Sequence, residues 1–193
     1  MFFNSISNKS DEEIMTLVQP GNRAALTELY RRYSTPLLRY FHRMLWKDHE
    51  KAQDFVQDLF LKIIQHGESF DVNMSFSTWI YSMAHNMCKN EYRKKAFRDA
   101  VHINHGADIV RDRVFEPDAS PDFNLNLENA LATLDADDKH LFVLRFELDL
   151  PMDNIAVMLA CPVGTVKSRI FNLKKKLAVQ LSELNPLAKT VWK

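Results

Sequence analysis

The chain contains only four glycines in 193 residues, at positions 21, 67, 106 and 164. Phosphate loops of nucleotide-binding α/β folds need closely spaced glycines, as in G-x-G-x-x-G or G-x-x-x-x-G-K-[ST], and neither pattern can be written here. Apolar residues instead recur at every third or fourth position, and no segment alternates convincingly between apolar and polar residues. These features argue against a nucleotide-binding α/β fold and predict an all-α protein.

Helical periodicity divides the chain into two helical parts. In the first part we expect helices over 11–18, from Arg23 to about 45 with a kink at Pro36, over 48–65 and over 76–97. A turn at Pro20-Gly21-Asn22 separates the first two. In the second part we expect four short helices, over 126–133, 137–147, 152–159 and 162–182.

Charge is distributed unevenly although its sum is zero, with 25 Lys plus Arg and 25 Asp plus Glu. Residues 85–98 carry five basic side chains and one acid, and residues 165–176 carry five basic side chains and no acid. Residues 99–138 offset them with ten acids and two basic side chains. The neutral total therefore does not exclude nucleic-acid binding, for which a local basic surface is the usual footprint.

Residues 99–125 of this acidic stretch contain Pro117 and Pro121 and have little apolar periodicity. A structureless loop of that length is unusual inside one compact domain, so we interpret it as a flexible acidic linker. The expected organisation is a first domain, a linker, a second domain and a tail, which cover 1–98, 99–125, 126–184 and 185–193.

Several protein classes are disfavoured by what the chain lacks. The first residues contain too short an apolar run for a signal peptide, and no stretch approaches the ~18 apolar residues of a membrane helix, so we expect a cytoplasmic protein without membrane insertion. Cys88 and Cys161 are isolated and are expected to be buried thiols rather than disulfide or zinc ligands. His102 and His105 lack a second ligand pair, so we expect no metal, no cofactor and no enzymatic activity.

The C-terminal part has helix-turn-helix spacing. A short apolar helix face over 155–159 is followed by the turn Ala160-Cys161-Pro162 and by a second apolar stripe over 166–177. The opposite side of the second helix carries Lys167, Ser168, Phe171, Lys174 and Lys175. Such a helix can enter the major groove, where cations neutralise phosphates and side chains reach base edges. The alternative is a solvated basic face with Phe171 packed on a neighbouring element.

Two helices of the first part also carry unusual sides. The helix over 76–97 sets cations and aromatic rings opposite its apolar side, which suits single-stranded DNA because rings stack on bases while cations follow the backbone. Trp79 and Tyr81 are expected to add stacking surface, with burial of Trp79 in the core as the alternative. On the helix over 48–65, Leu61 lies on the polar side among acids and amides, which favours a protein interface over DNA. An isolated exposed leucine without a role is the alternative.

Three segments resemble motifs of the bacterial sigma-70 family, in its small two-domain extracytoplasmic-function (ECF) group. Residues 52–60, AQDFVQDLF, resemble region 2.2, and residues 76–86, FSTWIYSMAHN, are similar to regions 2.3 and 2.4. Residues 162–169, PVGTVKSR, match the region 4.2 pattern P-x-G-T-V-[KR]-S-R. The chain departs from the family at Gln53, where an acid is usual, at Ala160, where a glycine is common, and at Asn172 and Leu173, where Arg or Ala is frequent.

The resemblance implies a sigma-2-like helical bundle and a sigma-4-like helix-turn-helix domain. It implies a dissociable polymerase subunit that confers promoter specificity, with partners in core RNA polymerase (clamp helices of the largest subunit and flap of the second-largest), promoter DNA and an anti-sigma factor. Residues 126–150 would sit on the flap.

The resemblance also assigns site residues by position. The minus-10 element would be bound by His85, Asn86, Lys89, Arg93 and Lys94. The minus-35 element would be read by Lys167, Ser168, Arg169, Phe171 and Asn172, with Lys174 and Lys175 on the same basic side. The core polymerase interface would contain Asp54, Gln57, Asp58, Leu61 and Lys62.

One alternative function stays open from the residues alone. A conventional helix-turn-helix regulator would bind its operator without polymerase and would use the first domain for sensing or dimerisation. It predicts tight binding of duplex DNA by the isolated chain, whereas a sigma factor needs polymerase.

Overall fold

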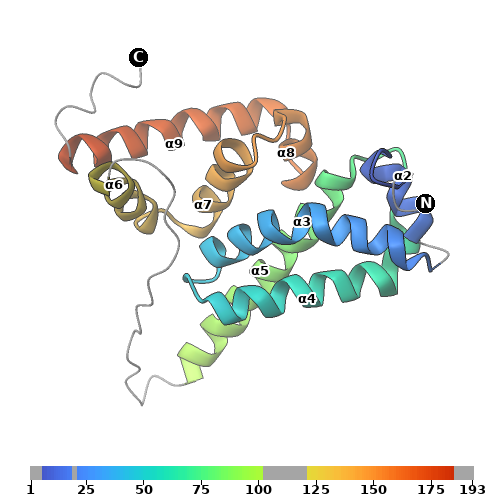
Figure 1. Cartoon of the computed structure of the whole chain (residues 1–193). Helices are drawn as coiled ribbons and strands as arrows, with labels where there is room; N and C mark the ends of the chain where they lie inside the picture. Colours follow the sequence, from blue (N-terminus) through green and yellow to red (C-terminus); the bar gives the residue numbers. More distant parts are fainter. Residues whose placement is uncertain (1–5, 19–20, 102–120, 185–193) are drawn as a thin grey trace. The chain divides into compact units, whose positions relative to one another are not determined.

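The computed structural model describes residues 6–18, 21–101 and 121–184, and every regular element among them is helical. The chain packs as two units, an N-terminal one that contains the described residues up to 101 and a C-terminal one that contains those from 121 on (Figure 1). The predicted all-α class is confirmed. None of the described helices combines the length and the apolar composition that crossing a bilayer requires.

The N-terminal unit is a helical bundle. Its elements are α2 (Asp11–Val18), α3 (Arg23–Met44), α4 (His49–His66), the 3₁₀ turn Gly67–Ser69 and α5 (Phe76–Val101). Figure 1 shows α3 and α4 side by side, with α5 crossing behind both and extending past them at its C-terminal end. The helix α3 continues through Pro36.

Local sequence signals explain where these helices begin. Ser10 and Glu13 form a reciprocal capping box at α2, in which the Ser10 amide donates to Glu13 Oε2 at 2.8 Å and the Glu13 amide donates to Ser10 Oγ at 3.2 Å. Gly21 takes a φ of +90° in the turn before α3, a conformation that glycine adopts without steric cost. The side chains of Asn22 and Asp48 then accept amide hydrogen bonds at the starts of α3 and α4.

The core of this unit forms where the apolar sides of the three long helices meet. Leu29, Phe41, Leu59, Ile63 and Ile80 are completely buried. Burying one such side chain contributes roughly 1.5–3 kcal/mol, so this contact holds the bundle together. The polar sides of α4 and α5 are therefore left outward.

The start of α5 is fixed by a side chain from α2. Glu12 Oε1 accepts the backbone N–H of Phe76 at 2.8 Å, which satisfies one of the amides that a helix leaves unpaired at its first turn. Burial alone would raise the pKa of Glu12, but the Phe76 amide and other hydrogen bonds outweigh it and lower that pKa. This contact helps to set where α5 begins against the bundle.

The C-terminal unit contains α6 (Pro121–Ala132), α7 (Ala136–Phe142), a π-helical turn over Val143–Glu147, α8 (Met152–Met158) and α9 (Val163–Leu184). The predicted helix over 137–147 is thus two pieces, α-helical and then π-helical. Asp149, with φ +47°, receives a hydrogen bond from Arg145 at 2.7 Å, and this pair closes the bend before α8.

Helix α9 is held against α6 and α7 by apolar and polar contacts. Its buried side contributes Val166, Leu173 and Leu177 to the core. At its C-terminal half, Lys176 pairs with Asp138 of α7, and Gln180 donates to Thr133 Oγ1 at 2.5 Å. One side of α9 is thereby committed to the fold, and the other is left to solvent.

Helical residues extend into both ends of the segment predicted as a linker over 99–125, because α5 continues to Val101 and α6 begins at Pro121, a residue favoured at the first helical position. The limits of the domains stay a prediction. The rest of the linker, His102, His105 and the tail 185–193 lie outside the described residues. Cys88 is buried as expected, whereas Cys161 is only half-buried because it lies in the turn before α9.

Candidate nucleic-acid interface

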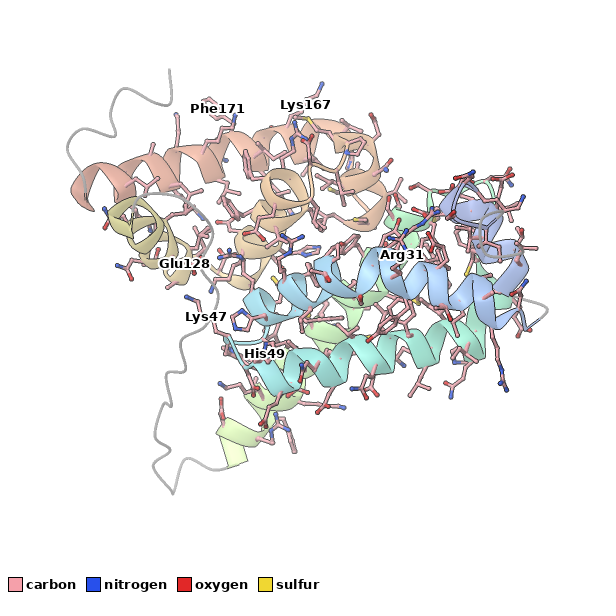
Figure 2. The ribbon with its side chains drawn as sticks, viewed as in Figure 1. Arg31, Lys47, His49, Glu128, Lys167 and Phe171 are labelled. Atoms are coloured by element: carbon pink, nitrogen blue, oxygen red, sulfur yellow. The ribbon has the colours of Figure 1, made fainter. Side chains whose placement is uncertain are left out.

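The outer side of α9 gathers all the side chains assigned to minus-35 recognition. The exposed residues on it are Lys167, Ser168, Arg169, Phe171, Asn172, Lys174 and Lys175. The buried side of the same helix carries Val166, Ile170, Leu173 and Leu177. Figure 2 shows Lys167 and Phe171 projecting from α9 on the side away from α7.

Phe171 does not pack on a neighbouring element, since 58% of it is exposed. Its ring lies 4.6 Å from Nζ of Lys175, one helical turn further on, in a cation–π contact that holds the lysine near the ring. Ser168 Oγ donates to the carbonyl of Gly164 at 3.0 Å, so its oxygen stays able to accept a hydrogen bond. The surface can therefore offer cations, one acceptor and an apolar ring to a DNA groove.

The turn before α9 fixes how this helix meets α8. Ala160 adopts φ +47° there, in the left-handed region that favours glycine. The Ala160 amide donates to the carbonyl of Val157 at 3.2 Å, and the Cys161 amide donates to that of Ala156 at 3.0 Å. The tight turn is thus built although the glycine common in the family is absent.

The outward side of α5 carries the residues assigned to the minus-10 element. Asn86, Lys89, Arg93 and Lys94 are exposed, whereas His85 is half-buried. Among the described residues, no ion pair engages Lys89, Arg93 or Lys94. These cations remain available for phosphates.

Trp79 and Tyr81, near the start of α5, do not offer the stacking surface expected of them in the same way. Tyr81 is only 3% exposed, and its ring lies against that of Tyr40 with centroids 5.6 Å apart, so the expectation that it offers a stacking surface is wrong. Trp79 is half-buried with its ring 5.2 Å from Phe70, which favours the core alternative. Tyr81 follows the apolar side of the helix, whereas Trp79 lies seven positions before Asn86 and therefore on the outward side, where packing on Phe70 covers part of its ring.

The exposed side of α4 brings together Asp54, Gln57, Asp58, Leu61 and Lys62. Leu61 is 52% exposed, as its position on the helix predicts. Ile64 is 57% exposed beside it, although it is one of the apolar residues that recur along this helix. The sequence does indicate this exposure, because Ile64 lies about 100° from the centre of the buried side when the helix turns ~100° per residue. Together they form an apolar surface framed by acids and amides.

A buried carboxylate attaches the second half of α5 to α4. Glu91 is 7% exposed, and its Oε1 lies 2.6 Å from Nζ of Lys51 and 2.7 Å from Nη2 of Arg98. Burial alone would raise the pKa of Glu91, but the hydrogen bonds from Lys51 and Arg98 outweigh it and hold the pKa below its usual value. Glu91 therefore stays ionised at neutral pH, and its negative charge is balanced by Lys51 and Arg98 rather than by the cations of the outward side.

Comparisons with known proteins match both units. The family description Sigma-70 region 2 covers residues 29–98, and Sigma-70, region 4 covers residues 124–177. The ECF RNA polymerase sigma factor SigW of Bacillus subtilis is 33% identical over 177 residues, which cover 86% of this chain and 94% of that protein. The RNA polymerase sigma-H factor of Pseudomonas aeruginosa is 26% identical over 93% of this chain and 97% of its own length.

Solved structures show the same fold. The sigma factor RpoE of Bartonella quintana, in complex with the anti-sigma factor NepR, superposes with a TM-score of 0.66 at 24% identity, over 80% of this chain and 97% of that one. CnrH in complex with the cytosolic domain of CnrY superposes with a TM-score of 0.68 at 21% identity, over 91% of this chain and 99% of that one.

The matches cover α3–α5 and the helix-turn-helix in chain order, and they coincide with the two exposed basic helix faces. The chain therefore belongs to the sigma-70 family of RNA polymerase sigma factors, in its ECF group.

Proposed function

We propose that this chain directs RNA polymerase to promoters by two DNA contacts, duplex readout of the minus-35 element by α9 and capture of the opened minus-10 strand by α5. The observation that carries the proposal is that both helices keep a basic, exposed side on units that match sigma region 4 and sigma region 2. A net charge of zero does not oppose it, because ten acids lie in residues 99–138, whereas residues 85–98 hold one acid and residues 165–176 hold none.

Helix α9 has the properties of a recognition helix. Lys167, Arg169 and Lys174 project cations that neutralise phosphates or reach guanine edges, and Phe171 offers an apolar ring for the methyl group of thymine. The residues that pack α9 against α6 and α7 lie on its other side, so docking needs no rearrangement of the core.

Helix α5 suits an opened strand. Its exposed side combines the amide of Asn86 with the cations Lys89, Arg93 and Lys94. An amide can hydrogen-bond the edge of an unpaired base while cations follow the backbone. Unstacking a base requires a few kcal/mol, which contacts of this kind return, so melting needs no nucleotide hydrolysis by this chain.

Helix α4 supplies the surface for the clamp helices of the largest polymerase subunit. Leu61 and Ile64 provide apolar area there, and Asp54 and Asp58 would repel DNA phosphates. Residues 126–150 would contact the flap of the second-largest subunit. Anchoring both units on polymerase turns the second DNA contact into an intramolecular one, which raises affinity without any new contact.

The remaining parts of the proposal follow from this role. The function is binding rather than catalysis, and it takes place in the cytoplasm, where polymerase and promoter DNA are found. An anti-sigma factor is a further partner, because solved structures of the same fold are complexes of sigma factors with NepR and with the cytosolic domain of CnrY.

Reconstitution tests the proposal directly. The purified chain is combined with core RNA polymerase, and bound promoters are selected from a random DNA pool. We expect selected sequences with two conserved elements at a fixed spacing and transcription that depends on the chain. Nanomolar binding of the selected duplex by the chain alone at physiological salt would instead favour an operator-binding regulator.

A further inference from the structure

Phe97 is the most exposed large apolar side chain among the described residues, at 72%, and none of the assigned contacts uses it. It lies on α5, four positions after Arg93 and eleven after Asn86. At ~100° per residue these three side chains fall within about 40° of one another around the helix, and Asn90 falls on the same side. Phe97 thus continues the outward side of α5, about 16 Å beyond Asn86 along the axis.

The opposite side of the same helical turns is firmly attached to the rest of the bundle. Tyr92 donates its hydroxyl to the carbonyl of Met44 and packs edge-on against the Trp46 ring, with centroids 5.4 Å apart. Nζ of Lys95 lies 4.2 Å from that same ring. Because Glu91 also joins α5 to Lys51 of α4, the last turns of α5 form a fixed support rather than a fraying end.

Charge decides which partner this exposed ring fits. The exposed cations Arg93 and Lys94 lie about one turn before it and Lys89 about two turns before it. Of the two acids nearest in the helix, Glu91 is buried on the opposite side, and the exposed Asp99 falls about 160° away around the helix. A protein-binding surface usually places apolar residues at its centre and is depleted of charge there. A ring bordered by cations and amides is instead the arrangement that binds single-stranded nucleic acid, by stacking on a base and neutralising its phosphates.

We infer that Phe97 is a base-stacking residue for the unpaired promoter strand, which extends the strand-binding side of α5 by one helical turn beyond Arg93. The inference rests on the proposed function. The stacked base would then be the unpaired base farthest along the strand from the base held near Asn86. Arg93 and Lys94 would contact the phosphates between these two bases.

The test uses holoenzyme and fork DNA. Core polymerase is reconstituted with the full chain and bound to fork-junction probes from a selected promoter, each with 2-aminopurine at one unpaired position. Stacking on an aromatic ring quenches 2-aminopurine fluorescence. We expect quenching at one position near the end of the opened segment with the native chain and with Phe97→Trp, and none there with Phe97→Ala or Phe97→Leu.

Affinity for the fork probe should fall about tenfold in both Phe97→Ala and Phe97→Leu, which is the size of one lost base stack. The leucine variant is the matched control, because it keeps an apolar side chain and loses only the π face. Affinity for core polymerase and for a fully duplex minus-35 probe should stay unchanged in every variant.

Each other outcome overturns the inference. Full affinity in Phe97→Leu would mean a general apolar contact, and weaker binding of core polymerase in Phe97→Ala would assign the ring to a protein partner. Tight fork binding without any position quenched through Phe97 would remove the stacking role and leave the proposed function intact. Failure of the native holoenzyme to bind any fork probe would reject both.

Discussion

Lys51 of α4 and Glu91 of α5 lie 40 positions apart in the chain, and their side chains meet at 2.6 Å. The same Glu91 oxygen also receives Arg98 at 2.7 Å. The carboxylate is nearly buried, whereas Lys51 and Arg98 are partly exposed. Each ion pair therefore contributes less to stability than a fully buried pair and more than a surface pair. The contact orients the half of α5 that carries Arg93, Lys94 and Phe97.

Replacing Glu91 by Gln should lower the free energy of unfolding by about 1–2 kcal/mol at pH 7, because the ionic hydrogen bonds become neutral. Since folding lowers the pKa of Glu91, its contribution is fully present above the unfolded value near 4.5 and is lost as pH falls through the folded value. Urea titrations at pH 7 and pH 3 should show a difference that shrinks in acid. Glu50→Gln, an exposed change on α4, is the control, and an equal effect there would refute this role of Glu91.

Replacing Ala160 by Gly should stabilise the C-terminal unit. A left-handed φ costs an alanine roughly 1–2 kcal/mol, which exceeds the extra chain entropy that glycine loses on folding. We expect a gain of about 0.5–1 kcal/mol in thermal or urea unfolding. The matched control is Ala156→Gly on α8, which should destabilise by about 1 kcal/mol because glycine is unfavourable inside a helix. Destabilisation by both changes would contradict strain at Ala160.

Replacing Leu61 or Ile64 by Arg should weaken association with core polymerase at least tenfold, because a charge would enter the apolar centre of the proposed interface. Both side chains are more than half exposed, so the free energy of unfolding should change by less than about 0.5 kcal/mol. Co-purification and titration with core polymerase measure the first effect, and thermal unfolding measures the second. Glu50→Arg on the same helix should leave association intact. If Ile64→Arg bound normally while Leu61→Arg did not, Ile64 would lie outside the interface.

Much of this architecture could be predicted from the sequence, because each helix has a clear apolar side and clear terminal signals. The helix-turn-helix and the outward position of Lys167, Asn86 and Leu61 follow from a period of 3.6 residues. Periodicity is less informative at the edge of an apolar side, where a neighbouring helix decides burial. Ile64 lies at such an edge, and the fold leaves it 57% exposed.

Other features depend on tertiary contacts that no local pattern contains. Tyr81 and Tyr92 both belong to a helix rich in aromatic and basic residues, but packing on Tyr40 buries the first, and a hydrogen bond to Met44 holds the second. The link from Lys51 to Glu91 joins residues that only folding brings together. Local sequence does not reveal which cations are engaged and which remain available for DNA.

Replacing Asn86 by Ala should impair formation of the open complex more than binding of the closed complex. The side chain is exposed on α5 and has no role in the core, so its loss affects strand capture without loss of the fold. Permanganate reactivity of unpaired thymines should fall several-fold at a promoter where closed-complex footprints are unchanged. A parallel loss of both signals would place Asn86 in duplex recognition instead.

Replacing Lys167 by Ala should reduce the salt dependence of promoter binding by holoenzyme. If Lys167 neutralises one phosphate, the slope of log K against log salt should become shallower by about 0.9. Lys176→Ala is the matched control, because it removes the same charge from the same helix at a position where Lys176 pairs with Asp138 inside the unit. Its slope should stay unchanged, while the unit loses a little stability. Equal changes in the two slopes would mean that α9 acts through its total charge, and the placement of its outer side against the minus-35 groove would then be wrong.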